Sequence, residues 1–562
     1  MSVSAGPRGV SWLYEATLHD SVFTPEKLSD EHRLIRRTAD EFVANEVLPA
    51  VDRLEAKDWA FVRQLVRQCA DLGLIGTDVP EEFNGLALDK VSSLIVSESV
   101  GRLPSWAVTF GGQTGLAITP LLCFGTAAQK QAYLPRLVSG ETIGAYALSE
   151  TGSGSDALGA RCRAARQEDG SFILTGEKMW ITNGGFADLF TVFAKADNDQ
   201  FTAFLVERTS SGVTTGKEEH KLGLHGSSTV PLILQDVRVP AGGVLGEVGK
   251  GHKVAFNVLN YGRFKLAAMC SGGARFVIAE SAQYASERRQ FGRALGEFGA
   301  IRYKLAEMTV RQYAVESMLY RIAGLLDQAG AAGLQRLPEA LEEFAVEASI
   351  VKVAGSEMLD YVVDENVQIH GGNGFVRDYP AERHYRDARV NRIFEGTNEI
   401  NRMLIPGMIA RREAARLASA SASAETGAGT GFSRPVGAMK TAASIVLSTA
   451  VGQYGKALGE QQEVLMFAAD VIIDTFASES VMLRAAASGD PLHATAAAVY
   501  INDAVGRVEL AARNALAAIG DAGRARLTGL RALMNIEPVN TIPLRHQLAE
   551  AVLSRRKYPF VS

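Results

Sequence analysis

The chain is poor in cysteine and has no excess of basic residues. Its four cysteines, Cys69, Cys123, Cys162 and Cys270, lie too far apart among 562 residues to indicate a zinc site or a disulfide framework. We expect buried, reduced thiols in a cytosolic protein. Lys plus Arg number 58 against 63 Asp plus Glu, which gives a net charge of −5. A dedicated nucleic-acid-binding protein would show a basic excess, so this class is disfavoured.

Long apolar runs are lacking as well. No run reaches the ~18 apolar residues that a membrane span needs, and residues 1–9 lack the apolar core of a signal peptide. We therefore expect a cytoplasmic protein without stable membrane insertion. Apolar residues make up 47% of the chain and charged residues 22%, which is typical of a soluble globular protein. At ~150 residues per domain, the length predicts three or four domains.

Hydrophobic periodicity predicts helical blocks on either side of one β block. A helix is expected to begin at Thr24, with Pro25 in its first turn. Asp169-Gly170 reads as a hairpin turn in an antiparallel β block. The predicted parts are an N-terminal helical domain (24–140), a middle β domain (141–245), a helical bundle (246–412), a linker (413–437) and an extra C-terminal helical domain (438–562).

A strand at Tyr146 runs into a Gly/Ser loop that ends at Asp156. Such loops, dense in backbone N–H groups, can wrap phosphates or the edge of a heteroaromatic ring. Gly152, Gly154 and Ala157 fit a loose dinucleotide fingerprint, but that motif requires a following helix and a parallel βαβ unit. A hairpin follows instead, so we reject a Rossmann fold. A flexible surface loop is the alternative for this segment.

Trp180 and Thr182 lie two residues apart on a predicted strand and therefore face the same side. A flat indole beside a hydroxyl donor suits a flavin ring. A core tryptophan beside a polar strand residue is the commoner explanation of such a pair by itself.

Two further segments could contact a phosphate. Glycines in Gln368–Gly374 permit close approach of a pyrophosphate, and Arg288 could pair with a phosphate. A solvated cluster of charges at a helix end is the ordinary explanation for Arg288. His370 has no ligands spaced around it, so a structural role is expected rather than metal binding.

Glu395 stands between an aromatic residue and a glycine in an otherwise apolar stretch. Burial disfavours the charged form of a carboxylate, which makes such a residue a candidate general base. A capped turn is the alternative for the tripeptide alone.

Together these segments resemble the acyl-CoA dehydrogenase family over residues 30 to 410, with long motifs at 147–159 and 368–387. Leu259–Phe264 and the extra C-terminal helical region resemble the very-long-chain branch and its bacterial long-chain relatives. The resemblance implies a mainly α fold with a central β domain: an N-terminal helical domain, an antiparallel barrel-like middle domain, a helical bundle and an extra C-terminal domain. It also implies non-covalently bound FAD.

The resemblance assigns roles to matching positions, with Glu395 as the catalytic base and no metal. The positions implied for FAD are Tyr146, Leu148, Ser149, Ser155, Trp180, Ile181, Thr182, Arg288, Gln290, Phe291, Gln368, Gly371, Gly372, Thr397 and Glu399. The positions implied for the substrate are Ser155, Asn260, Arg263, Phe394, Gly396 and Ala117. The set at 288–291 and 368–372 resembles the one that holds the adenine half of FAD across a subunit boundary, which implies a homo-oligomer, at least a dimer.

The implied reaction is the first step of fatty acid β-oxidation. Glu395 removes the α-proton while the β-hydride moves to flavin N5, which yields a trans-2-enoyl-CoA. Some family members carry the base near residue 262, but Gly262 cannot serve here. Electron-transferring flavoprotein is the implied acceptor. Residues 111–120 resemble the wall of the acyl tunnel, where the small Ala117 favours medium-to-long chains, although Pro120 departs from the expected glycine.

Two alternatives remain at this stage. An acyl-CoA oxidase would share the first half-reaction and use O2 as acceptor, and a non-catalytic DNA-binding or assembly protein could share the fold. Retention of Glu395 and the acidic net charge disfavour the second. The basic C-terminal segment Arg555–Phe560 is expected to be a solvated tail.

Overall fold

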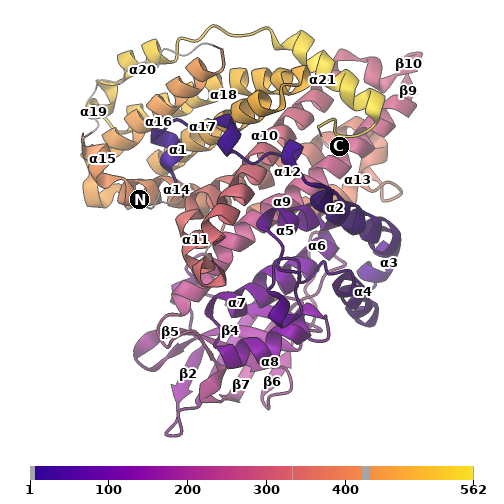
Figure 1. Cartoon of the computed structure of the whole chain (residues 1–562), viewed down its shortest axis with the longest axis vertical. Helices are drawn as coiled ribbons and strands as arrows, with labels where there is room; N and C mark the ends of the chain where they lie inside the picture. The colour runs from indigo at the N-terminus through magenta and orange to yellow at the C-terminus, as the bar shows by residue number, and fades with distance from the viewer. Residues whose placement is uncertain (1–6, 332, 420–430, 561–562) are drawn as a thin grey trace. The chain divides into compact units, whose positions relative to one another are not determined.

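The structure is a computed structural model that describes residues 7–331, 333–419 and 431–560 (Figure 1). The chain forms two compact units. The β-containing unit comprises Ser29–Gly273 and Leu326–Glu342, and the helical unit comprises Met1–Leu28, Ala274–Leu325 and Glu343–Ser562.

The β-containing unit begins with a helix that starts later than its sequence predicts. Pro25–Lys27 form a single 3-10 turn, and Thr24 makes no side-chain cap. The first long helix starts at Asp30, because the Ser29 hydroxyl accepts from His32 N and the His32 ring accepts from Ser29 N. The main helices of this unit are α2 (Asp30–Phe42), α3 (Val51–Glu55), α4 (Trp59–Asp71), α5 (Lys90–Val100), α6 (Pro104–Gly111), the π-helix η6 (Gly112–Ile118), α7 (Thr119–Phe124), α8 (Ala127–Val138), the first part of α9 (Gly251–Glu287) and α11 (Leu337–Glu343).

The sheet of this unit has eight strands in the order β6-β7-β3-β2-β4-β5-β8, with β1 beside β4. The strands are β1 (Gly144–Ala147), β2 (Arg163–Arg166), β3 (Phe172–Thr182), β4 (Leu189–Ala196), β5 (Gln200–Glu207), β6 (Val213–Thr215), β7 (Thr229–Val239) and β8 (Val244–Leu245). The hairpin predicted at Asp169-Gly170 joins the antiparallel strands β2 and β3. Most strand pairs are antiparallel, as predicted, but β1 and β2 each pair with β4 in parallel.

The helical unit gathers segments that are far apart in the sequence (Figure 1). Its long helices are the second part of α9 (Gly251–Glu287), α10 (Gly299–Gly330), α12 (Ala345–His370), α14 (Asn398–Arg412), α16 (Ser433–Tyr454), α17 (Gln462–Ser488), α18 (Pro491–Ala518) and α21 (Thr541–Arg555). Shorter elements are α1 (Ser11–Tyr14), the hairpin β9 (Arg289–Gln290) and β10 (Arg293–Ala294), α13 (Ala381–Ala388), α15 (Ala414–Ser419), α19 (Asp521–Arg524) and α20 (Leu527–Leu533). Within the predicted linker (413–437), 414–419 are helical, 433–437 already belong to α16, and 420–430 lie outside the described residues.

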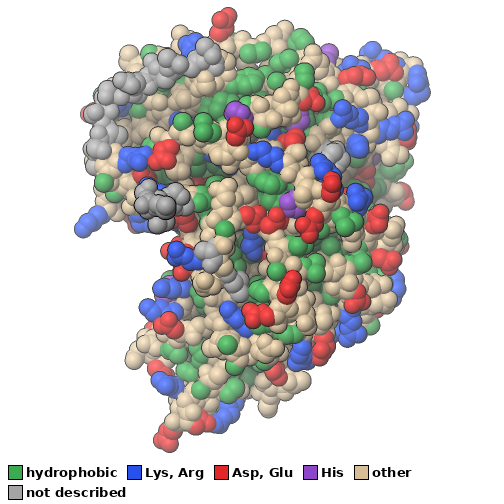
Figure 2. Space-filling view, viewed as in Figure 1, with side chains coloured by type: hydrophobic (Ala, Val, Ile, Leu, Met, Phe, Trp, Pro, Cys, Tyr) green, Lys and Arg blue, Asp and Glu red, His purple; other side chains and the backbone are tan. Residues whose placement is uncertain are grey.

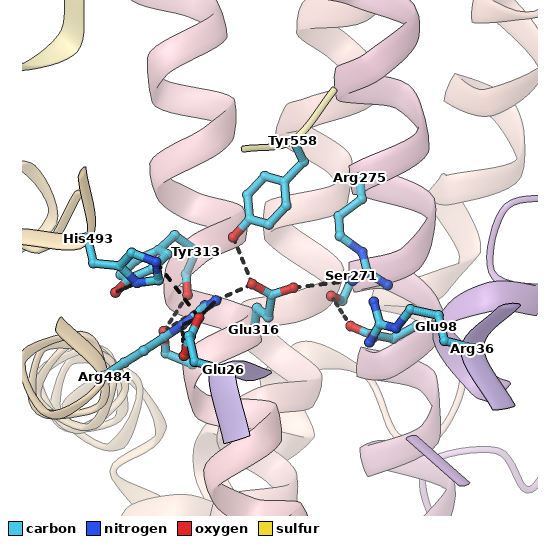
Figure 3. A network of polar contacts seen from close by, with 11 residues as sticks. Glu26, Arg36, Glu98, Ser271, Arg275, Tyr313, Glu316, Arg484, His493 and Tyr558 are labelled. Atoms are coloured by element: carbon cyan, nitrogen blue, oxygen red, sulfur yellow. Dashed lines mark hydrogen bonds and ion pairs between the residues drawn. The ribbon is translucent and has the colours of Figure 1, made fainter. Parts of the chain in front are cut away.

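A buried polar network joins the C-terminal helices to the rest of the helical unit (Figure 3). Both oxygens of the fully buried Glu316 on α10 are used. Oε2 accepts from Arg484 of α17 at 2.8 Å and from the Tyr558 hydroxyl at 2.9 Å, and Oε1 accepts from Arg275 at 3.3 Å. Arg484 also reaches Glu26 at 2.7 Å. Buried ion pairs need hydrogen bonds to all of their charged atoms, because a buried charge without partners is costly.

The C-terminal segment is therefore not the solvated tail expected from its sequence. Residues 555–557 are exposed, but Tyr558 and Phe560 are buried. The Phe560 ring lies 4.6 Å from Tyr313 and 4.8 Å from His493, measured between ring centroids. Burial of the two aromatic rings holds the segment against the protein although the three preceding basic residues are solvated, since burying each ring contributes about 3 kcal/mol.

Among the described residues, one helical stretch, Pro104–Phe124, is long and apolar enough to cross a membrane. It comprises α6, η6 and α7, and 72% of its most apolar window is buried inside the protein, as in a core helix. On the face drawn in Figure 2, acidic and basic side chains are interspersed, as the nearly equal numbers of 63 and 58 lead one to expect.

Candidate active site

In the β-containing unit, the Gly/Ser loop that follows β1 is anchored by a buried ion pair. Lys178 of β3 is fully buried, and its Nζ donates to Leu148 O at 3.1 Å and to Glu150 Oε1 at 2.6 Å. Glu150 Oε2 also accepts from Arg161 N at 2.6 Å. Burial alone would raise the pKa of Glu150, but the hydrogen bond from Lys178 and those from backbone N–H groups lower it. The carboxylate thus fixes the base of the loop.

The tip of this loop is open. Added Cβ atoms on Gly152 and Gly154 would meet nothing within 4 Å. Ser155 is exposed, while Ser153 is buried and donates to Asp156 O at 2.7 Å. A ligand could therefore approach the backbone at the tip closely.

Trp180 presents its indole to the surface of the same unit. It is 58% exposed and adopts φ +58°, at a register shift in the pairing of β3 with β7. A bulky residue with positive φ is a strained exception, and bulges of this kind re-aim a side chain. Thr182 is half-buried, whereas the Ile181 side chain is buried in the core. Met179 N donates to Ser149 O at 3.0 Å, so the first two predicted segments meet.

The predicted acyl-tunnel segment packs against the first half of α9. Cβ atoms added to Gly111 and Gly115 would meet Met269 at 2.9 Å and Lys265 at 3.8 Å, respectively. The buried Lys265 donates to Thr114 Oγ1 at 3.3 Å, and burial lowers its pKa to about 8. Ala117 lies on another side of the same helix, within 2.2 Å of where a Cβ on Gly144 would be. Its side chain thus packs against β1.

Asn260 and Arg263, which the resemblance assigns to CoA, are buried on α9 and contact each other. Arg263 Nη1 donates to Asn260 Oδ1 at 2.9 Å, and Asn260 Nδ2 donates to Leu341 O at 3.3 Å. Gly262 is buried between them. A separate cavity of about 490 Å³ opens beside Leu158 in this unit. Its lining includes Lys195, Lys250 and His252.

Glu395 lies in the helical unit, in the loop that precedes α14. It is half-buried with φ +56°, and Gly396 follows with φ +79°. The Thr397 side chain caps α14 by accepting from Ile400 N at 3.2 Å. Phe394 is half-buried, and Glu399 is exposed in the first turn of the helix. Two consecutive left-handed residues produce a sharp turn immediately before a capped helix.

Two residues that the sequence analysis did not single out hold this turn. Lys352 of α12 is fully buried, and its Nζ donates to Gly396 O and to Asn398 Oδ1, both at 2.7 Å. Asn401 Nδ2 donates to Glu395 O at 3.4 Å, to Gly396 O at 2.8 Å and to Thr397 O at 3.0 Å. The signal for Lys352 was present, since it is a single cation within the apolar run Ile350–Ala354.

The remaining predicted positions lie at the ends of α9 and α12 in the helical unit. Arg288, Gln290 and Gln368 are exposed, and Phe291, at the tip of the β9–β10 hairpin, is 93% exposed. Gly371 and Gly372 are exposed with open space around their Cα atoms.

His370 precedes these glycines at the end of α12 and is buried. Its ring stacks on Tyr284 at 4.0 Å between centroids, and its Nδ1 lies 2.8 Å from Asn366 O. Tyr284 OH also donates to His370 O at 3.2 Å. Among the described residues, no group of three or more His, Cys, Asp or Glu side chains could hold a metal ion.

Comparison with known proteins identifies the family of this chain. Family models for acyl-CoA dehydrogenases match residues 29–141 (N-terminal domain), 145–237 (middle domain) and 249–412 (C-terminal domain), and a further acyl-CoA dehydrogenase C-terminal model matches 438–532. The chain belongs to the acyl-CoA dehydrogenase family. The predictions of family, fold class and enzyme class are thereby confirmed.

Individual relatives span most or part of the chain. A "Probable acyl-CoA dehydrogenase" of Bacillus subtilis is 41% identical over 98% of both chains. Human very long-chain specific acyl-CoA dehydrogenase is 41% identical over 63% of this chain and 53% of its own length. The crystal structure of an acyl-CoA dehydrogenase from Bacillus anthracis complexed with FAD superposes with a TM-score of 0.95 at 41% identity, over 98% of this chain and 100% of that one.

The family is FAD-dependent, as predicted, and the residues present here fit that group. An exposed indole on a β-bulge offers a flat face for a fused ring. The open Gly/Ser loop and the exposed Gly371-Gly372 turn leave backbone accessible to phosphates. Each of these features, taken by itself, is compatible with a flavin or a phosphate group.

Proposed function

We propose that this acyl-CoA dehydrogenase oxidises medium-to-long fatty acyl-CoA to trans-2-enoyl-CoA, with Glu395 as the base that removes the α-proton. The observation that carries this proposal is the Glu395 turn, in which a half-buried carboxylate is held by its backbone in a left-handed conformation. A general base must be fixed in place while its carboxylate changes protonation state. The Glu395 turn fixes the residue through its backbone and leaves the carboxylate out of those hydrogen bonds.

The chain's own residues would divide the work. Glu395 would take the α-proton, and its backbone N–H would donate to the thioester carbonyl as negative charge develops there. Trp180, Thr182 and the partly exposed Tyr146, Leu148 and Ser149 would hold and orient the flavin. FAD, when bound, supplies the two-electron acceptor for the β-carbon's hydride.

The cavity beside Leu158 suits the nucleotide end of CoA. Lys195, Lys250 and His252 line it, and cationic groups favour phosphates. Asp199 in the same lining is paired with Arg163, so its charge is offset. We expect Lys250→Glu to raise KM for acyl-CoA about tenfold and to leave KM for the acyl-pantetheine analogue unchanged. An equal rise for both substrates would count against this placement.

Chain length is tested at Gly115 rather than Ala117. A larger residue at 117 would press on Gly144 and disturb β1, whereas a side chain at 115 would extend toward Lys265 of α9. If the acyl chain lies between η6 and α9, Gly115→Leu abolishes turnover of C16 acyl-CoA and spares C8. Equal losses on both would show that this helix face does not read the acyl chain.

The decisive test of the reaction is the Glu395→Gln variant. The purified variant should remain yellow, and palmitoyl-CoA should fail to bleach it under anaerobic conditions. We expect loss of at least about 10³-fold in the rate of reduction, because an amide cannot accept the proton. Bleaching at the wild-type rate would overturn the assignment of the base.

The acceptor and the assembly are also part of the proposal. We propose electron-transferring flavoprotein as acceptor, and timed reoxidation of the reduced enzyme in air distinguishes this from an oxidase. The exposed Phe291 and Phe375, 93% and 85% accessible, support burial against a second copy in a dimer or larger oligomer. Sedimentation of the FAD-loaded protein tests this. Cytoplasmic localisation stays a prediction.

A further inference from the structure

The turn that carries Glu395 has a backbone conformation that its own sequence does not favour. Glu395 adopts φ +56°, a left-handed conformation that is unfavourable for a residue with a side chain. Such conformations persist when the surroundings over-determine them, and they concentrate at functional sites. Something outside the turn must therefore hold it.

Lys352 supplies that hold. Its ammonium is fully buried on α12 and donates to Gly396 O and to Asn398 Oδ1, each at 2.7 Å. Burying an ammonium is costly unless it is well hydrogen-bonded, so its two bonds to the turn are a condition for keeping a lysine at this position. We propose that Lys352 is a positioning residue for catalysis, which fixes the backbone from Glu395 to Asn398 so that the carboxylate reaches the substrate's α-carbon.

A chain of polar contacts extends this hold to the C-terminal helices. Asn398 Nδ2 donates to Glu357 Oε1 at 3.0 Å. Glu357 receives two hydrogen bonds from Arg402, at 2.6 and 2.9 Å. Arg402 Nε in turn donates to Asp470 of α17 at 2.8 Å. The relay from Lys352 through Asn398, Glu357 and Arg402 to Asp470 lies within the helical unit. It gives the extra C-terminal helices a part in holding the base.

The principal variant is Lys352→Met, which keeps the length of the side chain and removes the donors. Loss of a buried charge together with its hydrogen bonds need not unfold the protein. We expect kcat to fall about 10²-fold, since a displacement of about 1 Å at the reacting group has an effect of this size. KM for palmitoyl-CoA should change less than about threefold, because Lys352 contacts the base's turn and not the substrate. FAD content should be unchanged.

Hydrogen–deuterium exchange gives a readout that does not depend on turnover. The peptide covering Glu395–Asn401 should exchange faster in Lys352→Met, while peptides from β3 and α17 match the wild type. The matched control is Lys304→Met, which breaks the Lys304–Glu365 contact between α10 and α12. It should leave both kcat and the exchange of the Glu395 peptide unchanged.

The relay is tested separately with Asp470→Asn, which keeps Lys352 in place. We expect a fall in kcat of about three- to fivefold with a small rise in exchange of the Glu395 peptide, as expected for a partner several contacts away. This variant alters only the far end of the relay, so the proposal can still be tested with it if Lys352→Met fails to fold. Wild-type kcat and exchange in Asp470→Asn would remove the C-terminal helices from the proposal.

The inference rests on the proposed function, and the two can fail separately. If Glu395→Gln still bleaches with palmitoyl-CoA, the proposed base is wrong whatever Lys352 does. If Glu395→Gln fails to bleach and Lys352→Met has wild-type kcat and wild-type exchange, only the positioning role is overturned. A fall in kcat with faster exchange across all helices would also overturn it, because that pattern marks a general loss of stability.

Discussion

In the helical unit, Glu316 is held at its carboxylate, and the turn that carries Glu395 is held at its backbone. Glu316 is fully buried, and its carboxylate oxygens accept hydrogen bonds from Arg484, Arg275 and Tyr558 (Figure 3). The Glu395 turn is held through its backbone carbonyls by Lys352 and Asn401. Hydrogen bonds to a carboxylate favour its charged form and oppose protonation. A structural carboxylate can accept that constraint, whereas a proposed base is better fixed through its backbone.

The comparison predicts that breaking the Glu316 cluster costs stability and not catalysis. Arg484→Met leaves Glu316 and Glu26 without their shared guanidinium, and we expect a loss of about 4 kcal/mol in unfolding free energy. Urea denaturation of the FAD-loaded enzyme measures this, and kcat of the folded fraction should match the wild type. Arg524→Met is the control, since Arg524 is exposed. An effect no larger than that of the control would refute a structural role for the cluster.

Acid should weaken the same cluster. Burial and the nearby charge of Arg484 lower the pKa of His493 to about 4, although Glu26 and Asp490 oppose this. The folded state thus favours neutral His493, so its contribution is present above the unfolded pKa of about 6.5 and is lost as pH falls toward 4. The loss is on the order of 3 kcal/mol.

The slope of stability against pH between 7 and 4 measures this contribution. In His493→Gln the slope should be shallower than in the wild type. His546→Gln changes an exposed histidine and should leave the slope as it is. Identical slopes in His493→Gln and the wild type would remove His493 as the cause.

The sequence predicted the parts of the molecule in which local signals and contacts agree. The hairpin at Asp169-Gly170 formed as predicted because its turn residues and its alternating strands are neighbours in the chain. The start of α2 was misplaced because Thr24-Pro25 satisfies local helix rules, yet Ser29 and His32 form the reciprocal cap. The parallel pairing of β1 with β4 joins residues more than forty positions apart, which no local pattern encodes.

At the candidate site, Glu395 was found because its residue type is unusual for its surroundings. Asn401 was missed because it donates to backbone carbonyls, and such contacts leave no residue-type signature. Lys352 did leave one, as a single cation in the apolar run Ile350–Ala354, but the sequence does not show which atoms it contacts. The C-terminal segment was misjudged from its basic residues, since Tyr558 and Phe560 find partners on α10 and α18.

At the Glu395 turn, Asn401→Leu should lower kcat more than it lowers the free energy of unfolding. The substitution keeps the side-chain volume and removes the donor to three consecutive carbonyls. We expect kcat to fall about 30-fold, which corresponds to about 2 kcal/mol. The control is Asn391→Leu, because Asn391 contacts a single carbonyl, Ala388 O, before the turn. Equal kcat in the two variants would show that the turn is held by other means.

The smallest effect on stability is expected from the loss of a single hydroxyl group, that of Tyr558. Tyr558→Phe removes the 2.9 Å hydrogen bond to Glu316 and keeps the buried ring, so unfolding free energy should fall by about 1.5 kcal/mol. The control is Tyr454→Phe, whose exposed hydroxyl makes only a 3.4 Å contact to Ala518 O and should contribute nothing measurable. Because Tyr558 acts on the carboxylate of Glu316, kcat should stay at the wild-type value. A fall in kcat without a fall in the free energy of unfolding would mean that the Glu316 cluster serves catalysis. The contrast drawn between the Glu316 cluster and the Glu395 turn would then be wrong.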